Sequence, residues 1–306
     1  MSTNTTVAAP VTESPNRTVP AWWQAGPYTL VFVLFFLVPL VLVLMVSFWD
    51  FNEYELIPAF TFRNYVAIFE GCSTLTDHGD FCVTLSTYLS TLKFSFLVWL
   101  VTLVLGFAVA YFLAFHVRSP GVQTALFVLC TVPFWTSNVI RMISWVPLLG
   151  RHGLVNQALQ GTGLVDEPVE WLLFSDFSVV LAFVHLYTMF MIVPIFNSMM
   201  RIDRSLLEAA SDAGASAWQT LWSVIVPLCR TGIIIGSIFV ITIVMGDFVT
   251  IGVMGGQQIA SVGKIIQVQT SYLQFPLAAA NAVILLAVVL MIIWGLTRLV
   301  DIRKEL

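Results

Sequence analysis

Two charged side chains lie inside long apolar runs of this sequence. Arg141 lies in an apolar run that begins near 123, and Asp247 lies in a run from about 228 to 254. Charged groups inside a bilayer are rare, and they usually face a water-filled cavity or pair with one another. The sequence therefore leaves two roles open: lining a polar path, or forming an Arg141–Asp247 ion pair that holds helices together.

Helical spacing gives each charge polar neighbours. On a continuous helix, Arg141 shares a face with Phe134, Ser137, Asn138 and Ser144. Asp247 shares one with Ile243, Thr250 and Met254. Aromatic side chains nearby would attract an organic cation through cation–π contact. A histidine at such a position also fits ordinary helix packing. The candidate pathway residues are Trp135, Asn138, Arg141, His185, Tyr187, Asp247 and Thr250.

The stretch 201–227 is dense in helix start and stop signals. Ser205 and Glu208 have the spacing of a capping box, and Asp203 is an alternative cap two residues earlier. Gly214 lies where a short helix would end, because glycine enters the left-handed conformation without steric cost. The pattern predicts a short helix, a glycine turn and a second helix.

The second helix of this stretch repeats the signals. Ser216 and Gln219 have capping-box spacing, and Pro227 is predicted to stop the helix. An alternative interpretation is an amphipathic connector lying in the membrane interface. Its apolar side chains would be Leu206, Leu207, Trp218, Leu221 and Trp222.

The composition indicates whether water or lipid surrounds most of the chain. Of the 306 residues, 58% are hydrophobic and only 10% are charged, and mean hydropathy is +0.92. A soluble domain carries about 25% charged residues, whereas a spanning helix needs roughly 20 mostly apolar residues. We therefore expect an all-α integral membrane protein with six transmembrane helices. The predicted spans are about 27–48, 87–115, 123–148, 178–199, from 228 onward, and 276–300.

The ends of the chain differ from this membrane domain of 26–300. Residues 1–25 are rich in Thr, Pro, Ala and Asn, which predicts a disordered tail. They lack the charged start and early apolar core of a signal peptide, so the first span is expected to be an uncleaved anchor. Residues 301–306 form a short charged tail.

Lysine and arginine predict the orientation. With both termini in the cytoplasm, eight of the 13 basic residues fall on the inner side. Ten of the 17 carboxylates fall in the two long outer loops. This agrees with the positive-inside rule and places 201–227 in the cytoplasm.

Several kinds of chemistry lack a sequence signature. The chain contains no Gly-x-x-x-x-Gly-Lys-Ser/Thr, nucleophile elbow or zinc pattern, and its four histidines are scattered. We therefore expect no catalytic residue, metal or cofactor on this chain, and without a basic patch no nucleic-acid partner. Cys72 and Cys82 share the first outer loop, where the alternatives are a disulfide in an oxidising periplasm or two unpaired thiols.

The loop at 201–227 resembles a known motif. Glu208-Ala209-Ala210, three residues, Gly214, nine residues and Val224-Ile225-Val226-Pro227 are similar to the EAA loop of bacterial ABC-importer permeases. Val224 and Val226 replace the usual Ile and Leu. Segments that resemble the spermidine/putrescine branch are 133–141, 246–250, 254–256 and 275–280.

The resemblance implies a type I importer fold with several partners. These are a second permease, which in that branch is a different chain, an ATPase dimer that holds ATP and Mg, and a periplasmic binding protein. It implies that the loop transmits ATPase closure to the fifth span. The residues carried over to that coupling role are Glu208, Ala209, Ala210, Gly214 and Pro227.

The substrate implied by the resemblance is a polyamine such as spermidine or putrescine. Related permeases also serve opines, aminoethylphosphonate or ferric iron. A rival from another class is a secondary transporter driven by an ion gradient through Arg141 and Asp247. That rival predicts internal repeats with broken helices at matching places, and the two halves show no convincing repeat.

A membrane scaffold without a transport role is a third alternative. In a scaffold, the polar helix faces around Arg141 and Asp247 would serve no purpose.

Overall fold

The computed structural model describes residues 21–52, 55–69, 83–256 and 258–298. The chain divides into two compact units, 1–45 and 46–306. The first contains α1 (Ala21–Phe32), a π-helical turn η1 (Val33–Leu37) and most of α2 (Val38–Val46). Its side chains from 25 to 45 are exposed and mostly apolar, as the predicted first span requires.

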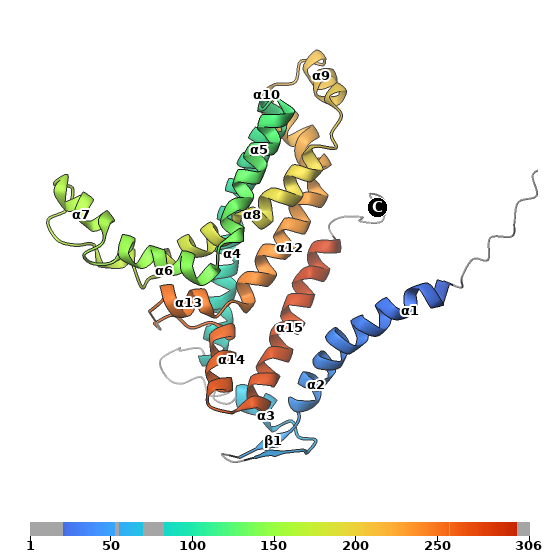
Figure 1. The fold of residues 1–306 in the computed structure, drawn as a ribbon, viewed down its shortest axis with the longest axis vertical. Coiled ribbons are helices and arrows are strands. Elements are labelled where there is room, and N and C mark those ends of the chain that lie inside the picture. The colour runs from blue at the N-terminus through green and yellow to red at the C-terminus, as the bar shows by residue number, and fades with distance from the viewer. Residues whose placement is uncertain (1–20, 53–54, 70–82, 257, 299–306) are drawn as a thin grey trace, which may run out of the picture. The chain divides into compact units, whose positions relative to one another are not determined.

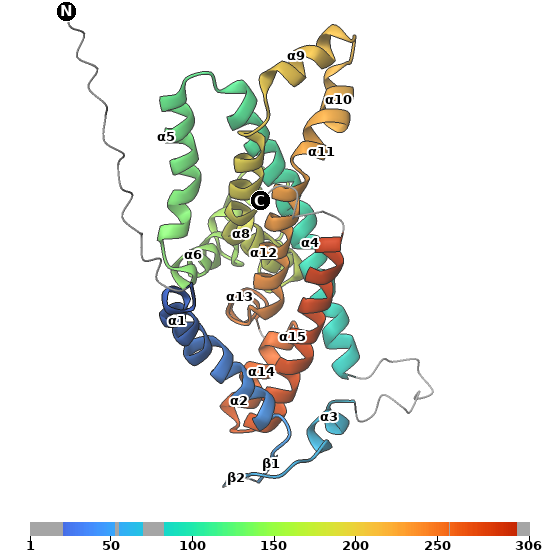
Figure 2. The ribbon, with the colours of Figure 1, turned by 90° about the vertical axis from the view of Figure 1, so that its right-hand side faces the viewer.

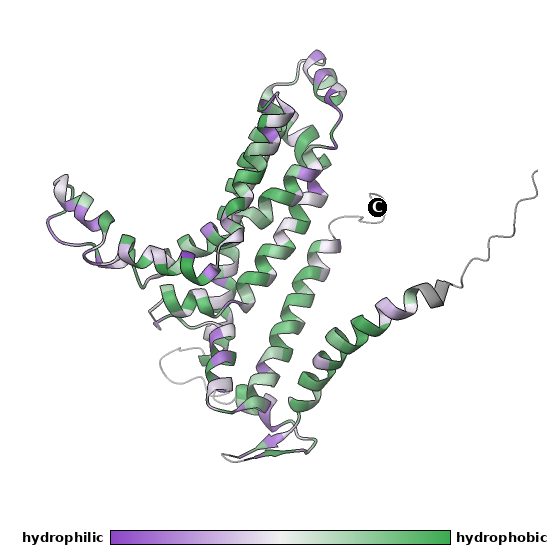
Figure 3. Cartoon of the chain, viewed as in Figure 1, coloured by the Kyte–Doolittle hydropathy of each residue, from purple (hydrophilic) through white to green (hydrophobic). Residues whose placement is uncertain are grey.

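Three long helices form the core of the second unit. They are α4 (Val83–Tyr111), α8 (Asp176–Met199) and α12 (Arg230–Gly246), and they pack side by side (Figures 1 and 2). Hydrophobic residues run along most of α12, while polar residues gather around α9 and the segment near α7 (Figure 3). The buried contact residues include Phe94 and Val98 of α4, Phe183, Met191 and Ile195 of α8, and Val240 and Val244 of α12.

Small residues let α12 approach α8 closely, as the Gly232 and Gly236 spacing predicts. A Cβ on Gly232 would lie 2.4 Å from both the Pro194 carbonyl oxygen and the Ser198 Oγ. A Cβ on Gly236 would lie 2.7 Å from the Met191 sulfur, which can move more easily. Gly232 therefore fixes the distance between the two backbones.

Replacing Gly232 by alanine should destabilise the α8–α12 contact, because the carbonyl of Pro194 cannot move aside as a flexible side chain can. Overpacking of this kind costs about 1–3 kcal/mol. The thermal midpoint of the detergent-solubilised protein should fall. The matched control is Gly295→Ala in α15, where a Cβ meets nothing within 4 Å. An equal midpoint for the two variants would contradict the packing account.

The six predicted spans appear as four long helices and two bent pairs. The long ones are Ala25–Val46, Val83–His116, Glu170–Met199 and Phe275–Arg298. Counting each bent pair as one crossing gives six among the described residues.

The third span is not the continuous helix that the sequence predicts, and the helical segment before the fifth span meets that span at an angle. Pro120–Trp135 and Asn138–Gly161 meet at 87°, and Ala217–Leu228 and Arg230–Gly246 meet at 68°. The first bend follows from Pro133 in the 3-10 turn η3 (Val132–Trp135) and from the extended backbone of Thr136. Phe134 and Arg141 therefore do not share one continuous helical face.

Asp247 also lies outside the fifth helix, contrary to the prediction. Helix α12 ends at Gly246, and Asp247 is extended with φ −79° and ψ 111°. Its carboxylate accepts the backbone N–H of Thr250, so it caps a new helix instead of continuing the old one. The helices that follow are α13 (Val249–Met254), α14 (Val262–Ser271) and α15 (Phe275–Arg298).

The outer segments are short. Strands β1 (Asp50–Phe51) and β2 (Leu56–Ile57) pair antiparallel, and α3 (Arg63–Ile68) follows. A further short helix, α7 (Leu154–Gly161), follows α6 (Asn138–Leu149). Cys72, Cys82, residues 1–20 and the tail 301–306 lie outside the described residues.

Candidate functional site

The carboxylate of Asp247 is held by side chains from two helices. The Tyr187 hydroxyl of α8 donates to Oδ2 at 2.5 Å, and the Thr250 hydroxyl of α13 donates to the same oxygen at 2.6 Å. The Thr250 backbone N–H donates to Oδ1 at 2.9 Å. Three donors therefore converge on this carboxylate at the end of α12, and a carboxylate in its ionised form acts only as an acceptor.

Arg141 belongs to α6 (Asn138–Leu149), which contacts both α8 and α13. Its side chain is only 8% exposed. One guanidinium nitrogen donates to Asn138 Oδ1, while the buried Nε has no hydrogen-bond partner. Arg141 and Asp247 thus bind different groups, and the predicted ion pair between them is absent from this structure.

His185 pairs with a tryptophan instead of joining this cluster. The Trp145 indole N–H donates to His185 Nδ1 at 3.0 Å, with the rings in T-shaped contact. This contact joins α6 to α8. Trp135, at the end of η3, is 83% exposed. The structure therefore brings together Tyr187, Asp247 and Thr250. Arg141, bonded to Asn138, lies close enough to Tyr187 and His185 to interact electrostatically with both.

The loop before α8 contacts the end of α13, a link that the sequence does not reveal. Phe174 and Gly256 both adopt left-handed backbone conformations, with φ 57° and 56°. The Phe174 ring lies against Gly256, where a Cβ would come within 2.7 Å of it. The Ser178 hydroxyl also donates to the Met254 carbonyl at 3.0 Å.

Asn156 holds the segment between α6 and α8 together through its side-chain amide. It is fully buried, and its amide donates to the carbonyls of Gly150 and Val169. Its Oδ1 accepts the Val169 backbone N–H at 2.8 Å. A single asparagine in a polar loop gives no sequence signal of this role. Near the start of α8, Lys93 and Asp176 form an ion pair between α4 and α8.

The loop at 201–227 begins with α9 (Arg204–Asp212), whose cap is Asp203. Asp203 Oδ1 accepts the Ser205 backbone N–H at 3.0 Å. Of the two caps that the sequence allows, Asp203 is therefore the one used, and the Ser205–Glu208 capping box does not form because Ser205 lies inside the helix. The Ser216–Gln219 capping box is confirmed at the start of α10 (Ala217–Thr220).

The glycine turn is confirmed in detail. Gly214 has φ +80°. Its N–H donates to the Ser211 carbonyl at 2.9 Å, and the Ala215 N–H donates to the Ala210 carbonyl at 3.0 Å. This is the pair of bonds of a Schellman motif. Glu208 and Ala209 are exposed on α9.

Pro227 does not stop the second helix, contrary to the prediction. The chain stays helical through the π-turn η5 (Leu221–Ile225) and α11 (Val226–Leu228), and the break comes at Cys229. Pro227 follows the wide π-turn η5, and prolines and π-turns are both places where helices bend, so the break at Cys229 comes two residues after the proline.

The Asp203 cap predicts a pH dependence of α9. Hydrogen bonds from the Ser205 backbone N–H and hydroxyl lower the pKa of Asp203. Its stabilising contribution is therefore complete above the unfolded pKa of about 3.9 and is lost as the pH falls through the lower folded value. Amide protection factors of 204–208 should stay constant from about pH 5 to 8. Asp203→Ala should reduce them and Asp203→Asn should retain most of them; unreduced protection in the alanine variant would contradict the cap.

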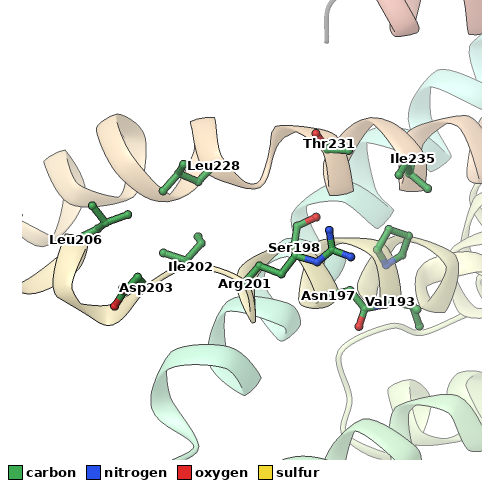
Figure 4. A pocket seen from close by; sticks show the side chains of 11 residues that line it. Val193, Asn197, Ser198, Arg201, Ile202, Asp203, Leu206, Leu228, Thr231 and Ile235 are labelled. Atoms are coloured by element: carbon green, nitrogen blue, oxygen red, sulfur yellow. The ribbon is translucent and has the colours of Figure 1, made fainter. Parts of the chain in front are cut away.

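A cavity of about 690 Å³ lies between this loop and the core helices. Figure 4 shows Ile202, on the linker to α9, and Leu228 of α11 on opposite sides of it. Asn197, Ser198 and Arg201, at the end of α8, add polar groups. The loop is therefore not packed tightly against α8 and α12, and it has room to move relative to them.

Comparison with known proteins defines the class of this chain. Residues 112–304 match the family described as binding-protein-dependent transport system inner membrane component. The chain belongs to this family. It is thus a multi-pass component of the inner membrane with a transport role.

The chain is also similar to several permease proteins that have names. The chain is 31% identical over 280 residues to the spermidine/putrescine transport system permease protein PotB of Escherichia coli K12, covering 90% of this chain and 96% of that one. It is 28% identical over 281 residues to PotB of Haemophilus influenzae, covering 90% and 93%. The inner membrane ABC transporter permease protein YdcU of Escherichia coli K12 is 27% identical over 223 residues, covering 68% and 67%.

Solved structures share the fold. A chain of a bacterial alginate ABC transporter, in complex with an alginate pentasaccharide-bound periplasmic protein, aligns with TM-score 0.69 at 18% identity. The alignment covers 91% of this chain and 92% of that chain. The architecture is therefore that of an ABC-transporter permease, which confirms the predicted type I importer fold.

Proposed function

We propose that this chain is the permease subunit of an ATP-driven importer that passes a polyamine, such as putrescine or spermidine, into the cytoplasm. One observation of the structure carries the substrate class. The Asp247 carboxylate is fixed beside the aromatic ring of Tyr187 at the end of a core helix. An anion beside an aromatic ring suits an alkylammonium group, because that group can form an ion pair with the anion and a cation–π contact with the ring. The permeases named PotB, which match over most of their length, support the same class.

The remaining assignments concern partners. A separate ATPase dimer, holding ATP and Mg, would dock on Glu208, Ala209 and Ala210, with Gly214 and Pro227 setting the path to α12. A periplasmic binding protein would deliver the substrate, and a different permease chain would complete the pore. Both termini would be cytoplasmic, as the basic residues predict.

The test is uptake of labelled putrescine and spermidine by cells with and without the gene. Uptake should be saturable, should require the gene, and should resist competition by an opine, aminoethylphosphonate or ferric iron. Equal uptake in both strains would refute the polyamine assignment. Competition by one of the other solutes would assign that solute instead.

A further inference from the structure

Three phenylalanines from three separate elements converge beside the Asp247 site. Phe190 of α8 lies 5.5 Å from Phe134 of η3 and 6.2 Å from Phe239 of α12, between ring centroids. The Phe134 and Phe190 rings meet edge to face at 84°. Phe190 also lies 6.1 Å from the ring of Tyr187, whose hydroxyl binds Asp247. The aromatic surface is therefore continuous with the anionic site.

These rings differ from the core residues of the same helices. Phe134 of η3 is 50% exposed and Phe239 of α12 is 47% exposed, whereas Phe183 of α8 and Val240 of α12 are fully buried. The α8–α12 contact is already filled by Met191 against Gly236. Packing of the core does not require three partly open aromatic rings at this level.

The position of Phe190 along α8 shows on which side of the Asp247 site these rings lie. Phe190 comes three residues after Tyr187, about 4.5 Å further along the helix. That displacement is away from the outer end of α8, where Asp176 pairs with Lys93. An alkylammonium group released by Asp247 would meet these rings next on its way toward the far end of α8.

The chemistry of the rings suits such a group. An ammonium ion that left the carboxylate for an aliphatic wall would lose its solvation without compensation. The negative faces of aromatic rings attract the cation, and they hold it more weakly than a carboxylate does. Weak, successive sites allow passage because each binds strongly enough to be entered and weakly enough to be left.

We propose that Phe134, Phe190 and Phe239 form an aromatic cation site, next after Asp247 on the inward path, which receives an alkylammonium group of the substrate. The inference rests on the proposed polyamine transport, and it adds a second site with its own residues. Phe190 is the centre of this site, because it alone contacts both other phenylalanines and Tyr187.

Fluorination of Phe190 tests the site without changing its shape. Unnatural phenylalanines with one, two or three ring fluorines progressively weaken the negative face of the ring while conserving its packing. The full transporter carrying them should lose putrescine kcat/KM stepwise, by roughly tenfold in total for the trifluoro ring, which corresponds to about 1.4 kcal/mol. The logarithm of kcat/KM should follow the number of fluorines.

The matched control is the same series at Phe196, a buried α8 ring that is 8% exposed and stacks on Phe127. Uptake should be flat across that series. A flat series at Phe190, with normal uptake by the unmodified transporter, would overturn the aromatic site and leave the proposed function standing. Absence of putrescine uptake by the unmodified transporter would overturn both.

Discussion

Transport should stop when Gly214 is replaced by valine, although the protein still inserts into the membrane. Gly214 has φ +80°, and a Cβ there meets nothing within 4 Å. The penalty is therefore local: a left-handed conformation costs a residue with a Cβ roughly 1–2 kcal/mol, and more when it is β-branched. The turn should relax to another backbone geometry. That change would break the two hydrogen bonds of the Schellman motif and alter the angle between α9 and α10.

The expected result is at least a tenfold fall in uptake, together with loss of the ATPase stimulation that substrate-loaded binding protein gives. Glu208→Arg should act similarly, since it reverses an exposed charge on α9 without touching the core. Gly214→Asn should retain most activity, because asparagine tolerates the left-handed region.

A matched control separates coupling from backbone strain. Gly163, in the outer loop, has φ +71° and equally open surroundings. Gly163→Val should therefore carry a similar local strain yet leave ATP hydrolysis coupled. If Gly214→Val transported normally, or if both valine variants uncoupled equally, the assigned role of the 201–227 loop would be wrong.

The second large effect is expected for Asp247→Asn. The change conserves shape but removes the charge, and it points an amide N–H₂ toward donors from Tyr187 and Thr250. A hydrogen bond to a charged group is worth about 1.5–3 kcal/mol, so kcat/KM for putrescine should fall about 10- to 100-fold. Tyr187→Phe, which removes one donor and keeps the carboxylate, should have a smaller effect.

Thr250→Val is the control for a purely structural role of Asp247. It removes one hydrogen bond to the carboxylate while keeping the charge and the Thr250 backbone N–H that Asp247 caps. If Thr250→Val and Asp247→Asn impaired uptake equally, the carboxylate would serve mainly as a helix cap. Wild-type uptake by Asp247→Asn would remove it from the pathway altogether.

Local signals made much of the architecture predictable. Charge-free runs indicate the membrane helices, because a bilayer requires about 20 apolar residues whatever else the chain does. Gly214 and the Ser216–Gln219 box were predictable since they act through their own neighbours in the chain. At the start of α9, Asp203 and Ser205 were both acceptable caps, and the sequence did not decide between them.

The bends and the site partners were harder to predict. The two helices of each bent pair are both apolar, so the hydropathy of the sequence does not indicate the 87° and 68° bends between them. The contact of Phe174 with Gly256 joins residues far apart in the chain, as does the convergence of Phe134, Phe190 and Phe239. Such contacts follow from tertiary packing, and one sequence carries no periodicity that reports them. Asp247 was visible as a charge, but its donors were not all foreseeable because Tyr187 comes from another helix.

The most direct test of polyamine import by an ATP-driven complex uses proteoliposomes. They would contain this chain with its ATPase and second permease, with substrate-loaded binding protein outside and ATP inside. We predict that labelled putrescine accumulates in these vesicles, and that a non-hydrolysable ATP analogue or omission of the binding protein abolishes accumulation. Accumulation driven by an ion gradient without ATP, or no accumulation of putrescine under any of these conditions, would contradict the account.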